Sequence, residues 1–331
     1  MESGAYRDAF VRAAYRGILG REPEQAVLTK QLPLGDTPPE FERDAERLLR
    51  EFLRSGEYLT LLAKGGRSEF ALGSWVIADL KSGIKLWLDL GDYGVSRQCL
   101  NETYEPIETT FLRNTIRPGM SFVDIGANIG WFALNGAKWV GPNGRVTAFE
   151  PREDTFARLS ASSHLNGFEG WVDTHNVALG AEEGFAALGC DAAERNSGGT
   201  WLLPTAALRQ QFEAGGAILR ETPVTTLDRV MAGRRVDVIK IDIEGAEPLA
   251  IEGAKQTIAK WRPTILSEVN YEVLPIVAQK TGAEYMAMMA GLGYVAHRIE
   301  NGAAGQPVPL DGAAPESGVA NYAFVPASAK S

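Results

Sequence analysis

Lysine, aspartate and glutamate alternate with isoleucine in one short segment, VDVIKIDIEGAE at residues 236–247. Read as a strand, the segment places Lys240, Asp242 and Glu244 on one face and the isoleucines on the other. Central strands of parallel sheets are normally apolar on both faces, so these charges must pair with one another or lie at the open carboxyl end of the strand. The alternative is a shorter strand followed by a solvated acidic loop.

Glu268, at the end of the segment PTILSEVN, adds a carboxylate at the same predicted edge. Several carboxylates and one lysine in a crevice indicate acid/base or hydrogen-bonding chemistry on a hydroxyl group. The same oxygens could ligate a hard divalent ion. Because Lys240 would offset part of the carboxylate charge, we predict no metal site.

A hydrophobic strand that turns through two glycines into a helix lies upstream, SFVDIGANIG at residues 121–130. Gly126 and Gly130 lack the Cβ atoms that would keep a ligand away from the backbone. The spacing differs from the three-glycine dinucleotide fingerprint, so an adenosyl ligand without phosphates fits better. The same pattern also occurs as plain packing in α/β proteins.

The next predicted strand, GRVTAFE, ends in Glu150, about twenty residues after the first glycine of the turn. Doubly wound folds place a carboxylate at this position to hold ribose hydroxyls. We therefore predict Glu150 as the ribose ligand. The alternative is a solvated residue at the end of a strand.

Composition and charge narrow the classes of partner. The chain has 331 residues with 45% hydrophobic content, and its formal net charge of −9 argues against nucleic acid and favours a neutral or cationic acceptor. Its two cysteines, Cys99 and Cys190, lack metal-type spacing. With no membrane-length apolar stretch and no signal-peptide pattern, we expect a cytoplasmic protein without integral membrane contact.

From Pro106 onward, strands and helices alternate along the chain, as in a parallel sheet with helical crossovers. The predicted strands are 121–125, 145–149, 172–177, 236–241, 263–269, 293–299 and 320–325, the last two forming a hairpin. The predicted helices are 129–140, 153–165, 246–260 and 272–291. Residues 181–221 break this rhythm with glycines and polar residues, which predicts a long functional loop.

The chain is expected to have three parts. Residues 1–66 show helical periodicity and predict a small helical module. Residues 67–105 contain two apolar runs around Lys81 to Gly83, which predict a β-hairpin and a connecting segment. Residues 106–331 form the main domain. The exposed edge of the hairpin is a plausible pairing surface, so a homodimer is possible.

An ordered set of segments resembles the FkbM family of S-adenosylmethionine-dependent methyltransferases. The set is YEPIE, VDIGANIGWF, AFEPRE, NVALG, VTTLD and KIDIEGAE, spread over about residues 104–270. The resemblance implies an α/β class I methyltransferase fold, Rossmann-like, with a seven-stranded, mostly parallel sheet and helices on both faces. It also implies S-adenosyl-L-methionine as cofactor and O-methylation of a hydroxyl on a sugar, glycan or natural product.

The resemblance also implies roles for individual residues. It places a set of residues around the methionine part of the cofactor, Glu150 on the ribose, and two residues beside the adenine. The methionine set is Asp124, Gly126, Asn128 and Gly130, and the adenine pair is Val177 and Ala178. Glu105 is expected to reach the cofactor, although a carboxylate at a helix start would explain it nearly as well.

Methyl transfer to a hydroxyl requires alignment of the acceptor oxygen and removal of its proton. From their positions on one face of the predicted strand, Asp242 is the predicted base and Lys240 the residue that orients it. Glu244 and Glu268 are predicted to bind neighbouring hydroxyls of the acceptor. Acceptor specificity is expected in residues 181–221, where Asn196, Ser197 and Trp201 could line a cleft, although Trp201 may equally be a packing residue. Two alternatives remain: an NAD(P)-dependent oxidoreductase of Rossmann type and a non-catalytic scaffold.

Overall fold

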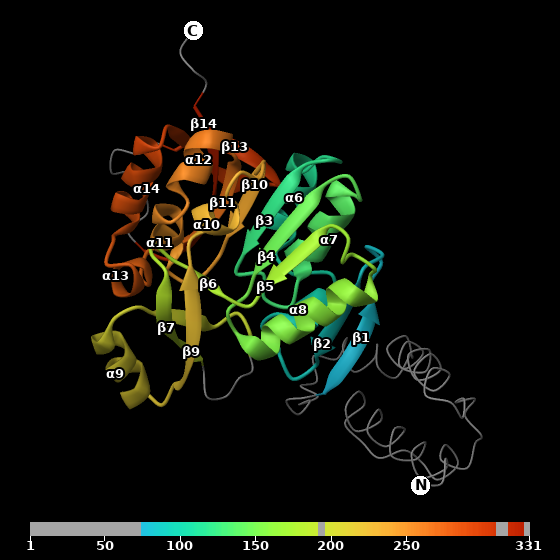
Figure 1. The fold of residues 1–331 in the computed structure, drawn as a ribbon, viewed down its shortest axis with the longest axis horizontal. Helices are drawn as coiled ribbons and strands as arrows, with labels where there is room; N and C mark the ends of the chain where they lie inside the picture. The colour runs from blue at the N-terminus through green and yellow to red at the C-terminus, as the bar shows by residue number, and fades with distance from the viewer. Residues whose placement is uncertain (1–73, 191–195, 309–316, 328–331) are drawn as a thin grey trace, which may run out of the picture.

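The computed structural model describes residues 74–190, 196–308 and 317–327. Their main element is an eight-stranded sheet with the order β13-β12-β14-β11-β10-β3-β4-β5 (Figure 1). Five neighbouring strands are parallel, and the three at one end pair antiparallel with their neighbours. The strands are β3 (Ser121–Ile125), β4 (Arg145–Phe149), β5 (Val172–His175), β10 (Val238–Ile241), β11 (Thr264–Asn270), β12 (Tyr294–Glu300), β13 (Ala303–Pro307) and β14 (Val319–Pro326).

The sheet therefore has one strand more than the seven expected. The additional strand is β13, which pairs with β12 at the edge of the sheet. Its sequence, AAGQP, has no hydrophobic alternation and reads as part of the glycine- and proline-rich loop before β14. The expected antiparallel pairing of β12 with β14 is present, with Ala296 opposite Phe324.

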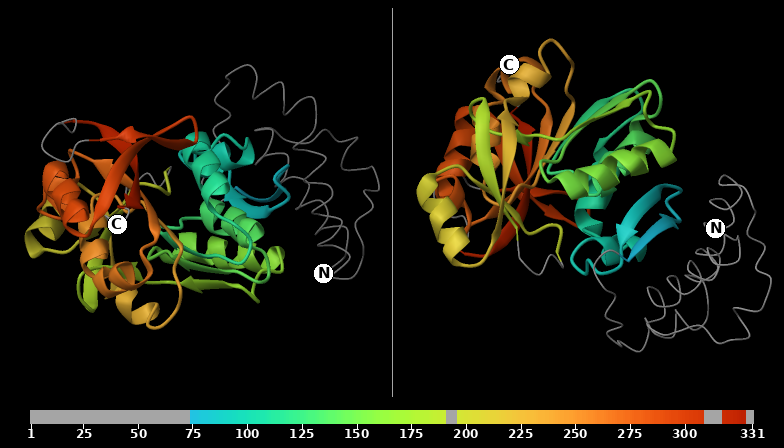
Figure 2. Two further views of the ribbon diagram at one scale, coloured as in Figure 1. Left: turned by 90° about the horizontal axis from the view of Figure 1, so that it is seen from above. Right: turned by 60° about the horizontal axis from the view of Figure 1, so that its bottom comes forward.

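Helices cover both faces of the main sheet, as Figure 2 shows from two directions. Side chains of consecutive strand residues point to opposite faces, so Phe122 packs with one apolar cluster and Val123 with another. The first cluster includes residues of α6 (Pro106–Thr115), α7 (Trp131–Val140) and α8 (Glu153–Leu165). The second includes residues of α11 (Glu247–Glu252), α12 (Lys255–Trp261) and α14 (Gly282–Gly291).

Two of the four predicted helices are each divided in two. The segment predicted as 246–260 is interrupted at Gly253, where a Cβ atom would lie 2.1 Å from the carbonyl oxygen of Gly180. The segment predicted as 272–291 contains α13 (Leu274–Val277) and then α14, which starts at a capping box formed by Thr281 and Glu284. Among the described residues, no helix is long and apolar enough to cross a membrane.

The predicted hairpin is confirmed as β1 (Trp75–Asp79) and β2 (Lys85–Asp89), which pair antiparallel. It packs on α8, where the Trp87 backbone N–H donates to Ser162 Oγ at 2.9 Å. A short helix, α5 (Ser96–Leu100), follows it and leads to α6. The predicted helical module at residues 1–66 lies outside the described residues.

The prediction of a long loop at residues 181–221 is wrong for the described part of this segment. That part contributes to a second, four-stranded sheet with the order β6-β9-β7-β8. Its strands are β6 (Ala178–Leu179), β7 (Gly184–Cys190), β8 (Thr200–Leu203) and β9 (Ile218–Thr225), and it carries α9 (Ala206–Ala214). The strands are rich in small residues, but Leu188 and Leu202 are buried between this sheet and the helices. This second sheet therefore forms one wall of the site described next.

Candidate functional site

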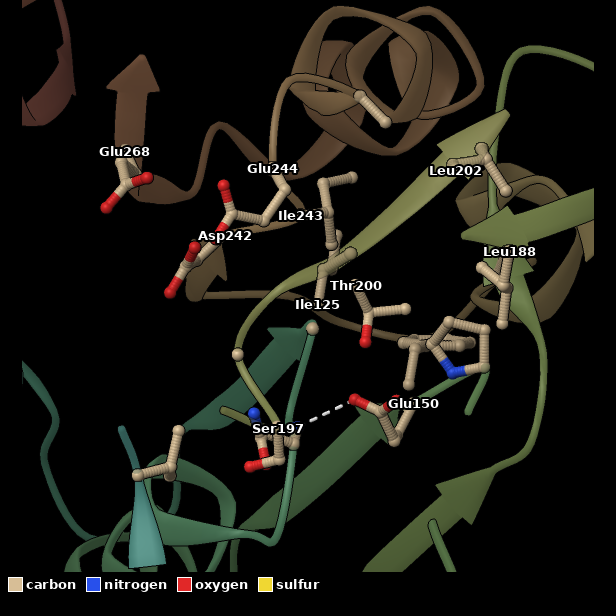
Figure 3. Close-up of a pocket in the computed structure, with 18 of the residues that line it drawn as sticks. Ile125, Glu150, Leu188, Ser197, Thr200, Leu202, Asp242, Ile243, Glu244 and Glu268 are labelled. Atoms are coloured by element: carbon tan, nitrogen blue, oxygen red, sulfur yellow. Dashed lines mark hydrogen bonds between the residues drawn. The ribbon is translucent and has the colours of Figure 1, made fainter. Parts of the chain in front are cut away.

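A cavity of about 320 Å³ lies at the carboxyl ends of the central parallel strands. The chain runs outward from β3 through β4 to β5 and then returns to form β10 on the other side of β3. Open α/β sheets bind their ligands at such a reversal of strand order. Part of the wall is shown in Figure 3, with Glu150 and Ser197 toward one end and three carboxylates toward the other.

The glycine turn after β3 is packed too tightly for a side chain at its first glycine. Gly126 has a φ of +81°, and a Cβ atom there would lie 2.0 Å from the carbonyl oxygen of Asp242. Gly126 and Asn128 both line the cavity. Gly130 does not: its hypothetical Cβ would face Leu159 at 2.8 Å, so this glycine permits α7 and α8 to pack closely. The two glycines therefore serve different purposes.

Glu150 follows β4 directly, and two backbone groups hold its carboxylate. The N–H of Asn128 donates to Oε2 and the N–H of Arg152 donates to Oε1, both at 2.9 Å. Burial raises the pKa of Glu150 to about 7, against the opposing effect of the two N–H groups. The result is an oriented acceptor for hydroxyl groups.

An apolar strip adjoins Glu150 on the cavity wall. It consists of Phe149, Val177, Ala178 and Leu179, from the end of β4 and the segment after β5. Val177 and Ala178, the two residues expected beside an adenine, are therefore next to the residue expected to bind the ribose. Flat apolar surface beside a hydroxyl acceptor suits a nucleoside.

The acidic end of the cavity lies just beyond the predicted strand 236–241. Strand β10 ends at Ile241, as predicted, and Asp242 and Glu244 lie in the following turn, where Glu244 has a φ of +51°. The expectation that Asp242 and Glu244 continue the charged face of the strand is therefore wrong, although the alternation in the sequence continues past its end. The acidic residues are nevertheless only partly exposed, and Asp242, Glu244 and Glu268 line the cavity together (Figure 3).

Glu244 and Glu268, at this end, tend to hold their protons. Burial, and then the charge of Asp242, raise the pKa of Glu244 to about 7. Burial and the neighbouring carboxylates, Asp242 first, raise the pKa of Glu268 to about 9. Protonated carboxyls can donate as well as accept hydrogen bonds, which suits contact with sugar hydroxyls. No group of three His, Cys, Asp or Glu side chains within the described ranges is arranged to hold a metal ion.

Lys240 lies behind the cavity wall and pairs with Asp242. Its Nζ is 3.0 Å from Asp242 Oδ2 and lies over the Phe132 ring, 4.7 Å from the centroid. Burial lowers the pKa of Lys240, but the carboxylates of Asp242, Glu105 and Asp124 outweigh this and raise it, so the side chain stays charged. Lys240 thus reaches the cavity only through Asp242.

Asp124 is fully buried and does not line the cavity. It stands beside Lys240 in the register of β3 and β10, so both side chains point to the same face of the sheet. Burial raises the pKa of Asp124 to about 6, and the Lys240 charge opposes that rise. Its position makes it a counter-charge to Lys240, which differs from the expected place beside the methionine part of the cofactor.

Glu105 does line the cavity, and it is held in an unusual backbone conformation. It occupies the position before α6 with a φ of +40° and makes no side-chain bond to cap that helix. Burial raises the pKa of Glu105 to about 7, while the Lys240 charge opposes the rise. Strained non-glycine residues are typical of ligand sites, and Asn128 and Glu244 on the same wall are also left-handed.

The second sheet, the residues just before β8 and the segment after the hairpin contribute the remaining wall. Asn196 and Ser197 line the cavity as expected, whereas Trp201 packs against Phe212, with ring centroids 5.6 Å apart. The sequence motifs missed one participant, Asp92, which is buried behind Ser197 and bonded to its hydroxyl. No spacing pattern marks the contact of Asp92 with Ser197, because it spans 105 residues.

Comparison with known proteins finds similarity to methyltransferases. A curated relative, "Methyltransferase 1" from Beauveria bassiana (strain ARSEF 2860), is 30% identical over 151 residues. The match covers 41% of this chain and 59% of the relative, so the chain spans less than two thirds of that protein's length.

Two solved structures show weaker similarity. The FkbM methyltransferase from Methylobacillus flagellatus KT is 15% identical, with a TM-score of 0.38, and the match covers 68% of this chain and 52% of that chain. TYW2 from P. horikoshii, solved in complex with MeSAdo, is 15% identical, with a TM-score of 0.40 and coverage of 95% and 97%.

The model of the methyltransferase FkbM domain family matches residues 124–296, which run from the end of β3 through all of α14 to the start of β12. That range is more than half of the chain, and it contains the glycine turn, Glu150 and the acidic end of the cavity. The protein therefore belongs to the FkbM family of methyltransferases.

Proposed function

We propose that this methyltransferase transfers the methyl group of S-adenosyl-L-methionine to a hydroxyl oxygen of a sugar, a glycan or a glycosylated natural product. The observation that carries the proposal is the division of the cavity. Glu150 and the apolar strip occupy one end, and Asp242, Glu244 and Glu268 occupy the other (Figure 3). One end suits the adenosyl part of the cofactor and the other suits an acceptor rich in hydroxyls.

The residues present fit this cofactor. Glu150 is held by two backbone N–H groups with its carboxylate on the cavity wall, as a pair of ribose hydroxyls requires. Val177 and Ala178 would border the adenine, and Gly126 and Asn128 would face the methionine part together with Glu105. When bound, S-adenosylmethionine supplies an electrophilic methyl group on a sulfonium. NAD(P) chemistry, the alternative from the sequence, is disfavoured by membership in a methyltransferase family.

On the acceptor side, this chain must align a hydroxyl and accept its proton. Asp242 is the proposed base, because it lines the cavity and its carboxylate is oriented by Lys240 at 3.0 Å. Glu244 and Glu268 are proposed to bind neighbouring hydroxyls of the same acceptor. A phosphate or carboxylate near the reacting hydroxyl would repel the Asp242 carboxylate, which disfavours acceptors of that kind.

The test is methyl transfer from methyl-labelled S-adenosylmethionine to a panel of acceptors. The panel contains neutral glycans, amino sugars, sugar nucleotides and glycosylated natural products, with amine and thiol compounds as competitors. NMR of the product assigns the label to oxygen, nitrogen or sulfur. The proposal expects an O-methyl product from a neutral or cationic sugar, which the Asp242→Asn variant forms much more slowly. Label found only on nitrogen or sulfur would contradict it.

A further inference from the structure

Asp92, in the turn after the hairpin, has a buried carboxylate that lies behind the cavity wall. Asp92 is 2% exposed. Its Oδ1 accepts from the Val95 N–H at 3.1 Å, and its Oδ2 accepts from the Ser96 N–H at 3.2 Å and the Ser96 hydroxyl at 2.9 Å. These bonds hold Asp92 against α5.

The same carboxylate also holds a segment about one hundred residues away. The Ser197 hydroxyl donates to Asp92 Oδ2 at 2.7 Å, and the Ser197 N–H donates to Oδ1 at 3.4 Å. Ser197 is 5% exposed and lines the cavity. Hydrogen bonds to a charged group are stronger than neutral ones, so Asp92 fixes the position of the Ser197 hydroxyl.

Ser197 in turn touches the glycine turn. Its hydroxyl lies 3.0 Å from Asn128 Oδ1, and the backbone N–H of Asn128 is one of the two donors to Glu150. Asn128 has a φ of +50°, a left-handed conformation that is held by its neighbours. The single Ser197 hydroxyl hydrogen is directed to Asp92, with Asn128 Oδ1 as a second, longer acceptor. A continuous set of polar contacts therefore links Asp92, Ser197, Asn128 and Glu150.

Packing between the two segments supports the link. Gly94, two residues after Asp92, lies so close to Asn196 that a Cβ atom would be 2.1 Å from its Oδ1. That oxygen accepts from the Gly198 N–H at 3.0 Å, which fixes its position. The segments on either side of Ser197 and Asp92 are thus in contact through backbone as well as side chains.

We infer that Asp92 is a positioning residue for cofactor binding, which acts through Ser197 and Asn128 to hold the Glu150 carboxylate in place for two ribose hydroxyls. This inference depends on the proposed cofactor site at Glu150. It assigns a role in cofactor binding to the segment that follows the hairpin, which lies outside the matched range 124–296.

The chain provides a matched pair of serines for the test. Ser96 and Ser197 both donate a hydroxyl hydrogen bond to Asp92 Oδ2, and both are buried, but only Ser197 lines the cavity. Ser96→Ala and Ser197→Ala should therefore lower the melting temperature of the cofactor-free protein by similar amounts. Calorimetric titration with S-adenosylhomocysteine should show a Kd about tenfold higher for Ser197→Ala, and within about twofold of wild type for Ser96→Ala.

Asp92→Asn tests the first step of the link. It should raise the Kd about as much as Ser197→Ala, and the double variant should bind no more weakly than the worse single variant, because both substitutions break one pathway. If Asp92→Asn does not fold, the comparison of Ser96→Ala with Ser197→Ala still tests the inference. Equal Kd values for Ser197→Ala and wild type, or equal weakening by Ser96→Ala and Ser197→Ala, would overturn the inference while leaving the cofactor site intact. Absence of binding by the wild type would instead overturn the proposed function itself.

Discussion

Lys240 Nζ lies 3.0 Å from Asp242 Oδ2, and this pair joins the buried interior of the sheet to the wall of the cavity. Lys240 is on β10, among Asp124 and Phe132, while Asp242 is in the turn that follows and faces the cavity. The lysine can therefore orient the carboxylate without contacting an acceptor. Substitution of Asp242 is therefore expected to change methyl transfer, and substitution of Lys240 is expected to change the stability of the fold.

Asp242→Asn should reduce methyl transfer with little effect on folding. The substitution keeps the size of the side chain but removes the proposed proton acceptor, so kcat should fall about 100- to 10,000-fold. The Kd for S-adenosylhomocysteine should change less than threefold, about 0.6 kcal/mol. Single-turnover kinetics at saturating acceptor and calorimetry measure the two quantities. Full turnover by this variant would show that another group is the base.

Lys240→Met should destabilise the protein. It leaves Asp124 and Asp242 without their cation in a largely buried setting, and removing one partner of a buried pair costs about 3–5 kcal/mol. Urea unfolding at pH 7.5 measures the loss. Because Asp124 holds a proton more readily at low pH, the cost should be smaller at pH 5 than at pH 7.5. An unfolding free energy equal to wild type at both pH values would contradict the assigned ion pairing.

Gly126→Ala should disrupt the glycine turn by contact with the Asp242 carbonyl as well as by backbone strain. The matched control is Gly119→Ala, since Gly119 has a φ of +82° but no atom within 4 Å of its hypothetical Cβ. The control should cost only about 1–2 kcal/mol, the cost of the left-handed conformation. Gly126→Ala should cost more and also abolish cofactor binding. Equal destabilisation of the two variants, measured by chemical unfolding, would show that the close approach is unimportant.

The stability of the cofactor-free protein should fall as the pH rises, in part because of Glu268. Its pKa is raised from an ordinary value of 4.5 to about 9 in the folded state, so the folded protein holds this proton more tightly than the unfolded chain. The resulting stabilisation is complete below about pH 4.5 and is lost as the pH rises through about 9.

The variant Glu268→Gln stays neutral and should escape this loss. Its melting temperature should exceed that of the wild type by about 3 °C or more at pH 8.5, and the difference should shrink toward pH 5. The exposed residue Glu272 provides a control, since Glu272→Gln should follow the wild type at every pH. A pH-independent difference for Glu268→Gln would mean that its proton is not held as the burial implies.

Much of the cofactor end was predictable because its signals are local. The predictions of a strand followed by Gly126, and of a second strand ending in Glu150, each need only the pattern of a few neighbouring residues and a position at the end of a strand. The main parallel strands followed from the same alternation. The resemblance to the FkbM family added the order of these segments. The match of the family model to residues 124–296 confirmed membership in that family.

The remaining parts depend on contacts that leave no local pattern. Asp92 and Ser197 meet across 105 residues, and neither belongs to a recognisable motif. The second sheet escaped prediction because β7, GFAALGC, consists mostly of small residues, two of them glycines. The predicted strand 236–241 ends where β10 ends, but the placement of Asp242 and Glu244 on the strand face was wrong, because they continue the alternation after the strand has become a turn.

The most direct test of the cofactor site is calorimetric titration of the wild type and Glu150→Ala with S-adenosylmethionine and S-adenosylhomocysteine, with NADH as a control. The wild type should bind both sulfur compounds saturably and bind no NADH, and Glu150→Ala should weaken both about 30-fold or more through loss of hydrogen bonds to the charged carboxylate. Unchanged binding by Glu150→Ala would contradict the ribose assignment, and binding of NADH alone would contradict the cofactor.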